Sequence, residues 1–294
     1  MKQSLRTLLA HSIDYAGLFP PASLDMKQVV RNYAAYRKSS ESWLLARLIV
    51  PVSRLDEFVV EQRELDDQNG QSDPWLLSVL PGKDLSADIT TILNFNKEYG
   101  KSRRVEVLEL KAGTKEEIVS ASNLIPKTWD VFFEVDVNQL PLIQAIREQG
   151  RKAKIRTGGI AEGLIPSSAH IARFLATCIH EGVPMKATAG LHHPLRAEQK
   201  LTYSPDSRSA VMHGFLNVFL AAALLQGGAT VAEATELIEE QDSHKITIGE
   251  TSIRWRSWEL SIDRLANIRK TFLAGFGSCS FRDPIDDLAT LHLV

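Results

Sequence analysis

The chain has 294 residues, of which 44% are hydrophobic and 24% are charged, as in an ordinary globular protein with material for a large core. Its formal net charge of -2 argues against a general nucleic-acid-binding surface. The two cysteines, Cys178 and Cys279, are too few for a disulfide framework and show no metal-ligand spacing.

Apolar, β-branched runs alternate with segments of helical periodicity along most of the chain. The predicted strands span residues 12–19, 43–51, 75–80, 104–111, 131–137, 153–157 and 184–189. The predicted helices between them span residues 26–37, 54–65, 86–99, 115–124, 140–149 and 168–180. This alternation is typical of an α/β fold with a parallel sheet, and seven units in one run favour a closed barrel. We therefore predict a single (β/α)8-barrel (TIM-barrel) domain over residues 1–294.

The last part of the chain is less regular. Residues 212–226 predict a long apolar helix, and the alternation of apolar and polar residues over 245–260 predicts a β-hairpin. The eighth strand is either residues 272–281, followed by a helix over 284–291, or part of the hairpin. In the first arrangement, residues 228–270 elaborate the barrel before its last strand.

Charged residues occupy strand positions that should face the interior of the barrel. Alternate strand residues point inward, and the outward ones must be apolar to meet the helices. The alternation directs inward four carboxylates and five cations, namely Asp14, Arg47, Glu109, Lys111, Glu134, Asp136, Lys154, Arg156 and Lys186. Because buried charge is costly unless it is paired, this set indicates a functional site. The alternative is a structural network of ion pairs, such as Glu134 with Lys154.

Two compact motifs end the sixth and seventh predicted strands. They read Lys154-Ile155-Arg156-Thr157-Gly158-Gly159 and Lys186-Ala187-Thr188-Ala189-Gly190-Leu191-His192-His193-Pro194. Each places a lysine inside the strand and a glycine where the strand leaves the barrel. Glycine at such a position permits close approach of the backbone to a ligand, often a phosphate, or forms a tight turn.

Further binding groups are expected in the loops at the carboxyl ends of the strands. One of the adjacent residues His192 and His193 could reach the site, and His192 with His213 and a carboxylate could hold a metal ion. The loop with Gly277 and Ser278 could offer backbone N–H groups to an anion.

The two lysine motifs resemble those of the Schiff-base (class I) aldolases of the deoxyribose-phosphate aldolase type. In that family, strand six carries the imine-forming lysine in a Lys-Thr-Ser-Thr-Gly-Phe-like stretch, and strand seven carries a second lysine in a Lys-Ala-Ser-Gly-Gly-like stretch. Lys154 and Lys186 match in order and lie 32 residues apart, which is one βα unit. Glu134 on the preceding strand also fits the pattern of this family. Arg156, where the family has a small residue, and the His192-His193 pair depart from the pattern.

The resemblance implies a lyase of the aldol type, in which Lys154 forms an imine with a small anionic carbonyl compound, phosphorylated or not. Lys186 is the second catalytic lysine, and Glu134 or Asp136 would move protons. Arg156 and Lys186 should lower the pKa of Lys154, whereas Glu134 and Asp136 should raise it. The expected substrate-binding residues are Asp14, Arg47, Lys111, Arg156, Gly158, Gly159, Thr188, Gly190, His192, His193, Gly277 and Ser278.

Two other hypotheses stay open. In the first, Glu134, Asp136 and His192 hold a divalent metal ion in a metal-assisted lyase, isomerase or hydrolase. In the second, the barrel binds a ligand without catalysis. The aldolase hypothesis requires no cofactor. We expect a small-molecule anionic substrate and no nucleic-acid partner, and the sequence leaves open whether the protein forms a homo-oligomer. Because no signal peptide or membrane-spanning segment is predicted, we expect a cytoplasmic protein without membrane contact.

Overall fold

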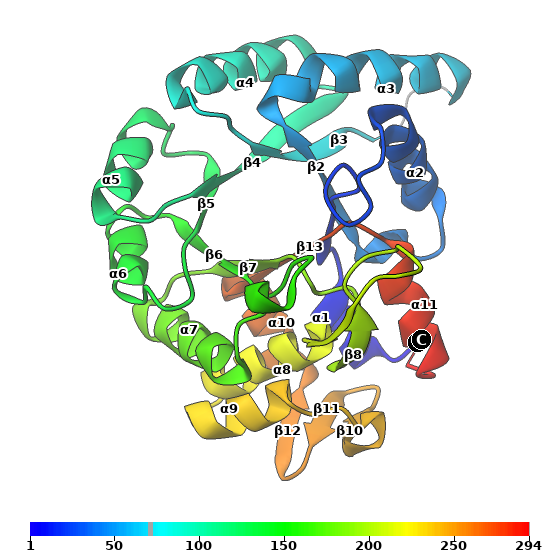
Figure 1. Ribbon diagram of the computed structural model, residues 1–294, viewed down its shortest axis with the longest axis vertical. Helices are drawn as coiled ribbons and strands as arrows, with labels where there is room; N and C mark the ends of the chain where they lie inside the picture. Colours follow the sequence, from blue (N-terminus) through cyan, green and yellow to red (C-terminus); the bar gives the residue numbers. More distant parts are fainter. Residues whose placement is uncertain (70–72, 294) are drawn as a thin grey trace.

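A closed barrel of eight parallel strands stands at the centre of the computed structural model, which describes residues 1–69 and 73–293 (Figure 1). The strands are β1 (Ile13–Tyr15), β2 (Leu45–Pro51), β3 (Trp75–Leu80), β4 (Arg103–Lys111), β5 (Asp130–Glu134), β6 (Lys152–Arg156), β7 (Met185–Thr188) and β13 (Leu273–Ser278). They follow one another around the barrel in that order, and each neighbouring pair is parallel. The predicted (β/α)8 barrel is confirmed.

Helices cover the outside of the barrel. They are α2 (Met26–Lys38), α3 (Leu55–Asn69), α4 (Leu85–Tyr99), α5 (Lys115–Leu124), α6 (Pro141–Glu148), α7 (Ser168–Glu181), α8 (Phe215–Gln226) and α11 (Arg282–Thr290). The side chains that cap α2, α4, α5 and α7 each accept a hydrogen bond from a backbone N–H of the first turn, and they are Asp25, Asp84, Thr114 and Ser167. Such caps satisfy amides that would otherwise lack partners, so they fix where these helices begin.

The helix α8 is apolar on all sides because protein surrounds it. It packs against α7, α9 (Val231–Ile238), α10 (Ile262–Thr271) and the barrel strand β13. Phe215 of α8 stacks on Phe276 of β13 with the ring centroids 5.1 Å apart. A helix without a polar face is typical of a fully buried element, and this one closes the outer layer beside β7 and β13.

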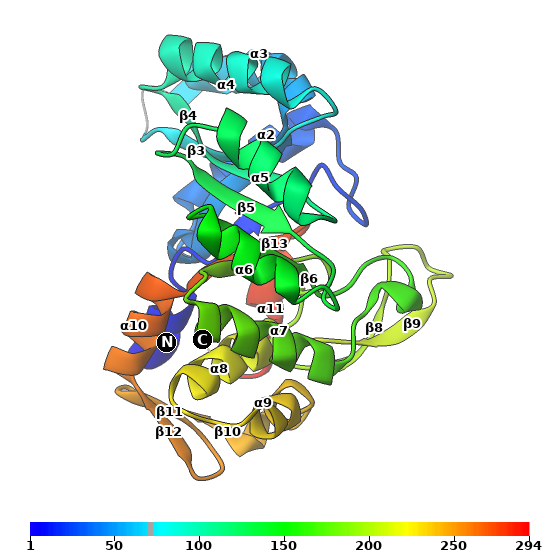
Figure 2. The same ribbon diagram turned by 90° about the vertical axis from the view of Figure 1, so that its left-hand side faces the viewer.

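The eighth barrel strand is β13, so the alternative in which the predicted hairpin supplies it is wrong. The residues of that hairpin form a separate antiparallel sheet of β10 (Ile246–Ile248), β11 (Ser252–Trp255) and β12 (Trp258–Ser261). The sheet packs against α1 (Gln3–Leu9), α8 and α10, away from the carboxyl ends of the barrel strands (Figure 2). Ser261 caps α10 directly after β12, so the chain must pass through that helix before it enters the barrel again.

A second hairpin, which the sequence does not predict, extends from the side of the barrel at which the cavity residues of β6 and β7 lie. It consists of β8 (Ala197–Lys200) and β9 (Ser209–Met212) and belongs to the connection from β7 to α8. Figure 2 shows it projecting beyond the barrel beside the loop between β6 and α7. Its short strands are largely exposed on one side, which explains why the sequence gives only a weak strand signal there.

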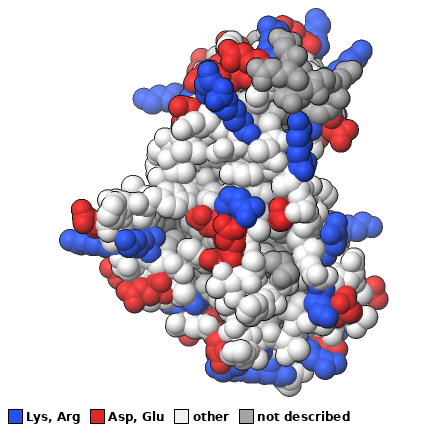
Figure 3. Space-filling model, turned by 90° about the vertical axis from the view of Figure 1, so that its right-hand side faces the viewer, with Lys and Arg blue, Asp and Glu red and all other residues white. Residues whose placement is uncertain are grey.

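The surface carries charges of both signs. On the face in Figure 3, basic and acidic side chains are interspersed, in keeping with the formal net charge of -2. In the part of the chain that the structure describes, no helix is both long and apolar enough to cross a membrane.

Candidate active site

Five charged residues from five strands form a buried layer inside the barrel. Asp14 lies on β1, Glu109 on β4, Glu134 on β5, Lys154 on β6 and Lys186 on β7, and each is buried. The parallel register places Glu134 beside Lys154 and Lys154 beside Lys186, so these three side chains lie at one level of the barrel. Their inward orientation follows from the period-two alternation, because Phe133, Ile155 and Ala187 between them pack outward in the apolar core.

Glu109 links the two lysines. Its Oε2 lies 2.8 Å from Nζ of Lys154, and its Oε1 lies 2.6 Å from Nζ of Lys186. Ser78 donates a hydrogen bond of 2.5 Å to the same Oε1. Both oxygens of this carboxylate are therefore occupied, as a buried anion requires.

The network continues on both sides of Glu109. Glu134 binds Lys154 through Oε2 at 2.9 Å and Arg156 through Oε1 at 3.1 Å. On the other side, Asp14 binds Lys186 and also accepts a hydrogen bond of 3.0 Å from the backbone N–H of Arg47. Positive and negative groups thus alternate from one residue to the next, which makes the burial of so many charges tolerable.

The pKa of Lys154 is raised. Burial disfavours its charge, but the carboxylates of Glu109 and Glu134 outweigh burial. Burial likewise opposes ionisation of both glutamates, yet the lysines dominate and hold the pKa values of Glu109 and Glu134 below the ordinary range. The lowering of the Lys154 pKa by Arg156 and Lys186, expected from the sequence, is therefore overcome by the two carboxylates. At rest, Lys154 is an ammonium group between two anions.

A cavity of about 710 Å³ opens above this layer at the carboxyl ends of the strands. Glu109, Glu134 and Lys154 line its floor, whereas Lys186 and Asp14 do not reach its wall. The two predicted catalytic lysines thus differ in position. Lys154 is accessible to a ligand in the cavity, and Lys186 supports the floor through Glu109.

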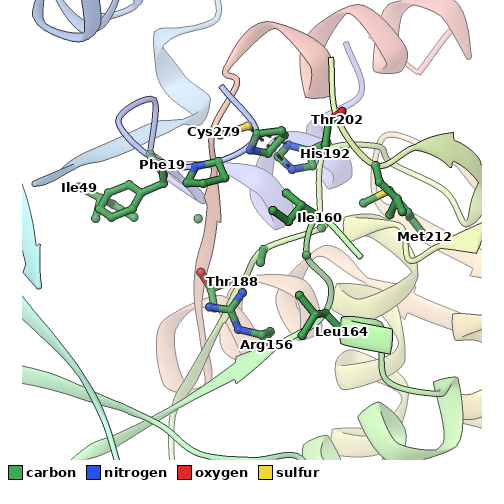
Figure 4. Close-up of a pocket in the computed structure, with 18 of the residues that line it drawn as sticks. Phe19, Ile49, Arg156, Ile160, Leu164, Thr188, His192, Thr202, Met212 and Cys279 are labelled. Atoms are coloured by element: carbon green, nitrogen blue, oxygen red, sulfur yellow. Dashed lines mark hydrogen bonds between the residues drawn. The ribbon is translucent and has the colours of Figure 1, made fainter. Parts of the chain in front are cut away.

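Cationic groups surround the floor. Arg156 lies beside Thr188, its register partner on β7, and both line the cavity (Figure 4). The Arg156 side chain is 40% exposed and binds Glu134 only through Nε. Lys111 is exposed, lines the same cavity and forms no ion pair with any residue that the structure describes. An anionic ligand group could therefore bind near Lys111 and Arg156 without displacing the floor contacts.

The predicted glycines have different surroundings. A Cβ atom on Gly158 would lie 2.9 Å from Cα of Gly190, and Gly190 has a φ of +79°. Only glycine allows the exits of β6 and β7 to approach so closely. Gly158 does not line the cavity, whereas Gly159, Gly190 and Gly277 do.

His192 forms a buried part of the cavity wall. Ser278 donates its hydroxyl proton to the carbonyl O of Ser280 at 2.6 Å, so its Oγ accepts the hydrogen bond of 3.0 Å from Nδ1 of His192. Burial lowers the pKa of His192 to about 4, and the ring is neutral near pH 7. Cys279 lies 4.0 Å from Nε2 of this ring, while burial raises the pKa of its thiol.

The other two predicted histidines have separate partners. His193 binds Asp287 of α11 through Nδ1 and also lines the cavity. His213 accepts a hydrogen bond of 3.0 Å from Arg196 at Nδ1 and donates one of 2.7 Å to the carbonyl O of Pro166 from Nε2. Because both of its ring nitrogens are occupied, His213 is not available as the metal ligand suggested from the sequence.

The prediction that Asp136 points into the barrel is wrong. Strand β5 ends at Glu134, two residues earlier than Asp136, so the alternation no longer applies there. Asp136 is exposed and accepts a hydrogen bond of 2.8 Å from the backbone N–H of Asn138. The proposed metal ligands Glu134, Asp136 and His192 do not converge, and no cluster of three such ligands occurs among the described residues.

Arg47 and Glu106 extend the network at the β2 side. Arg47 lies 3.3 Å from Glu106 and 3.9 Å from Asp14, so this predicted anion-binding residue is engaged within the protein. Sequence reasoning missed Glu106 because a register shift between β3 and β4, at Leu77 and Ser78, breaks the alternation along β4. It also missed Ser78, for which an uncharged polar residue in a buried strand was the available signal.

No protein-family model matches this chain, and comparisons with curated proteins and with solved structures found no match. The barrel fold itself is compatible with an enzyme and supports many different reactions. The function of this chain is therefore inferred from the geometry of its site.

Proposed function

We propose that the chain is an aldol-type lyase in which Lys154 forms an imine with a small anionic carbonyl compound. The observation that carries this proposal is the position of Lys154. Its Nζ lies on the floor of the cavity, 2.8 Å from Glu109 and 2.9 Å from Glu134. Imine formation needs an amine that loses protons and an acid that returns them, and adjacent carboxylates serve both needs.

Arg156 provides a means of coupling substrate binding to this proton transfer. In the resting site Arg156 stabilises the anionic form of Glu134, and its charge contributes to the low pKa of that carboxyl. A substrate anion bound to Arg156 would offset that positive charge, so Glu134 would become more basic when the substrate arrives. Glu134 would then accept a proton from Lys154.

The covalent step follows from these roles. The neutral Nζ of Lys154 adds to the carbonyl carbon, and one Nζ proton passes to the carbonyl oxygen. Glu134 returns its proton to the resulting hydroxyl, which departs as water and leaves a cationic imine. That imine accepts the electron pair of the bond between the α and β carbons and becomes an enamine, while the Glu134 carboxylate takes the proton of the β-hydroxyl, which becomes the carbonyl of the released fragment.

The raised pKa of Lys154 favours a second candidate, an enolising isomerase or lyase without a covalent intermediate. In this reaction the Lys154 ammonium would donate a hydrogen bond to a substrate carbonyl, and Glu134 would remove a proton from the neighbouring carbon. The two candidates use the same residues and differ in whether nitrogen bonds to carbon.

Reductive trapping separates the two candidates. The protein is incubated with cyanoborohydride and a panel of aldehydes, ketones and 2-oxo acids, and adducts are located by peptide mass spectrometry. We expect one adduct, on Lys154, which disappears in Lys154→Ala. Lys152→Ala is the matched control, because Lys152 lies on the same strand and binds Asp130 outside the cavity. Turnover of a carbonyl compound without any adduct would support the enolising reaction instead.

A further inference from the structure

The wall of the cavity changes character with distance from the floor. The charged groups of Glu109, Glu134 and Lys154 occupy the floor. Apolar side chains form much of the wall, as Figure 4 shows for Phe19, Ile160 and Met212. The larger apolar residues of the wall include Phe19, Ile49, Ile160, Leu164, Leu201 and Met212. Such a cavity suits a ligand with one polar end and one apolar end.

Two connections at the carboxyl end of the barrel supply four of these six apolar side chains. Ile160 and Leu164 belong to the connection from β6 to α7, and Leu201 and Met212 belong to the β8–β9 hairpin and its turn. Leu201 and Met212 form a small apolar cluster with Ala210 that is separate from the main core. Two of its three residues, Leu201 and Met212, line the cavity, so the cluster contributes to the cavity wall and not to the main core.

Ile160 and Leu164 are also unusually exposed for apolar residues. Their exposed fractions are 51% and 46%, and both side chains lie at the cavity wall (Figure 4). Apolar side chains that gather around a concave site commonly contact a ligand. A three-carbon compound on the floor would leave these side chains in water, since a cavity of about 710 Å³ is within the range that holds much larger ligands.

A feature of α11 argues against a phosphorylated substrate. In barrels of this kind, a phosphate often binds near the ends of strands seven and eight at a helix N-terminus. Here Asp283 occupies the first turn of α11, where its carboxylate accepts hydrogen bonds of 2.8 Å from Ser280 and 2.7 Å from Tyr203. Asp283 also lines the cavity, so its negative charge would repel a phosphate group.

We infer that the substrate is an unphosphorylated amphipathic carbonyl acid, whose anionic carbonyl end meets Lys154 and Arg156 and whose aliphatic or aromatic substituent lies against Ile160, Leu164, Leu201 and Met212. The identity of the polar end rests on the proposed function. The apolar substituent rests on the cavity wall alone. It is therefore testable by binding, without any turnover.

The test uses straight-chain 2-oxo acids from pyruvate to 2-oxooctanoate, with dihydroxyacetone phosphate as the phosphorylated probe. Calorimetry gives the Kd of each compound for the full chain. We expect Kd to fall roughly fourfold for each added methylene, the effect of burying that group. The phosphorylated compound should bind no tighter than pyruvate. An equal Kd across the series, no binding by any member, or preferential binding of the phosphate would overturn the inference.

Leu164→Gln tests the assigned wall, and Leu93→Gln is its matched control. Leu93 lies on α4 with an exposed fraction of 48%, close to that of Leu164, but it does not line the cavity. We expect Leu164→Gln to reduce the preference for 2-oxooctanoate over pyruvate roughly fivefold or more, and Leu93→Gln to leave it unchanged. An unchanged preference in Leu164→Gln would contradict the assignment of this wall.

Reductive trapping on the same samples separates this inference from the proposed function. A chain-length dependence without any adduct on Lys154 would leave the amphipathic site standing and remove the imine mechanism. An adduct on Lys154 that forms equally well with every chain length would support the mechanism and overturn the inference.

Discussion

Lys154 and Lys186 are register partners on the neighbouring parallel strands β6 and β7, and each binds a different oxygen of Glu109. Two ammonium groups on adjacent strands would repel each other in a site from which water is largely excluded. The bridging carboxylate makes this arrangement possible. Glu109 therefore has a structural role, which can be measured through the stability of the fold and without an activity assay.

Glu109→Gln should destabilise the fold by roughly 3–5 kcal/mol, because it leaves two buried lysines without their shared anion. Urea denaturation at pH 7 measures this change. The double variant Glu109→Gln with Lys186→Met should recover part of the loss, since it removes one of the uncompensated cations. A single variant as stable as the wild type would show that the carboxylate is not needed to hold the lysines together.

The pH dependence of trapping should report the two carboxylates beside Lys154. Their charges raise the pKa of this lysine, so the trapping rate should increase with pH over the alkaline range. In Glu134→Gln the rate profile should move to lower pH by about 1–3 units, because one of the stabilising anions is lost. The prediction concerns the position of the rate profile along the pH axis, and a change in the maximum trapping rate does not affect it.

Glu106→Gln is the control for that displacement. Glu106 lies on β4 like Glu109, but it binds Arg47 and Arg104 and has no contact with Lys154. Its pH profile for trapping should coincide with that of the wild type. An equal displacement in both variants would mean that the effect comes from the general field of the barrel and not from the contact with Lys154.

The sequence contains enough information for the barrel and for the centre of its site. Alternation along β5, β6 and β7 directed Glu134, Lys154 and Lys186 inward, and the structure places them there. These strands are covered by helices, so their outward positions must be apolar and the phase of the pattern is clear. The positions of Lys154 and Arg156 at the site therefore follow from the sequence pattern alone.

The other site residues were harder to predict, because their positions depend on where strands end and where the register between strands shifts. Asp136 was misplaced because β5 ends two residues before it, and Glu106 was missed because of the register shift between β3 and β4. Neither the end of β5 nor this register shift is marked by a characteristic residue type in the sequence. The apolar wall was missed for another reason, since Ile160 and Met212 both reach the cavity only through the course of two long connections, β6 to α7 and β7 to α8, which periodicity does not describe.

Arg156→Met should weaken binding of pyruvate roughly tenfold to a hundredfold, as expected for the loss of a charge-assisted hydrogen bond. The residue lies at the cavity wall, and its side chain is 40% exposed. Calorimetric Kd values for pyruvate measure the change. Arg104→Met serves as control, because Arg104 is an exposed arginine that binds Glu106 and does not line the cavity. Equal affinities in Arg156→Met and the wild type would remove Arg156 from the anion site.

The free energy of unfolding should fall as the pH decreases from 6.5 toward 4.5. Burial lowers the pKa values of His192 and His213 to about 4, below the ordinary value of 6.5. Between these values the unfolded chain binds more protons than the folded chain, so the stabilisation is complete above pH 6.5 and decreases below it. Each histidine should account for roughly 2–3 kcal/mol over this range. Protonation of Glu109 and Glu134 should lower the free energy of unfolding mainly below about pH 4.5, because the pKa values of both carboxyls are lowered in the folded state.

Urea denaturation at pH 7.5, 6.5, 5.5 and 4.5 measures the dependence, and His213→Gln should reduce its slope by about half. Glutamine keeps a donor and an acceptor for Pro166 and Arg196 but cannot take up a proton, so the variant removes the titration with limited damage to the hydrogen bonds. His180→Gln is the matched control, since His180 is exposed on α7. A slope that is the same in all three proteins would show that the buried imidazole of His213 is not a source of the acid sensitivity.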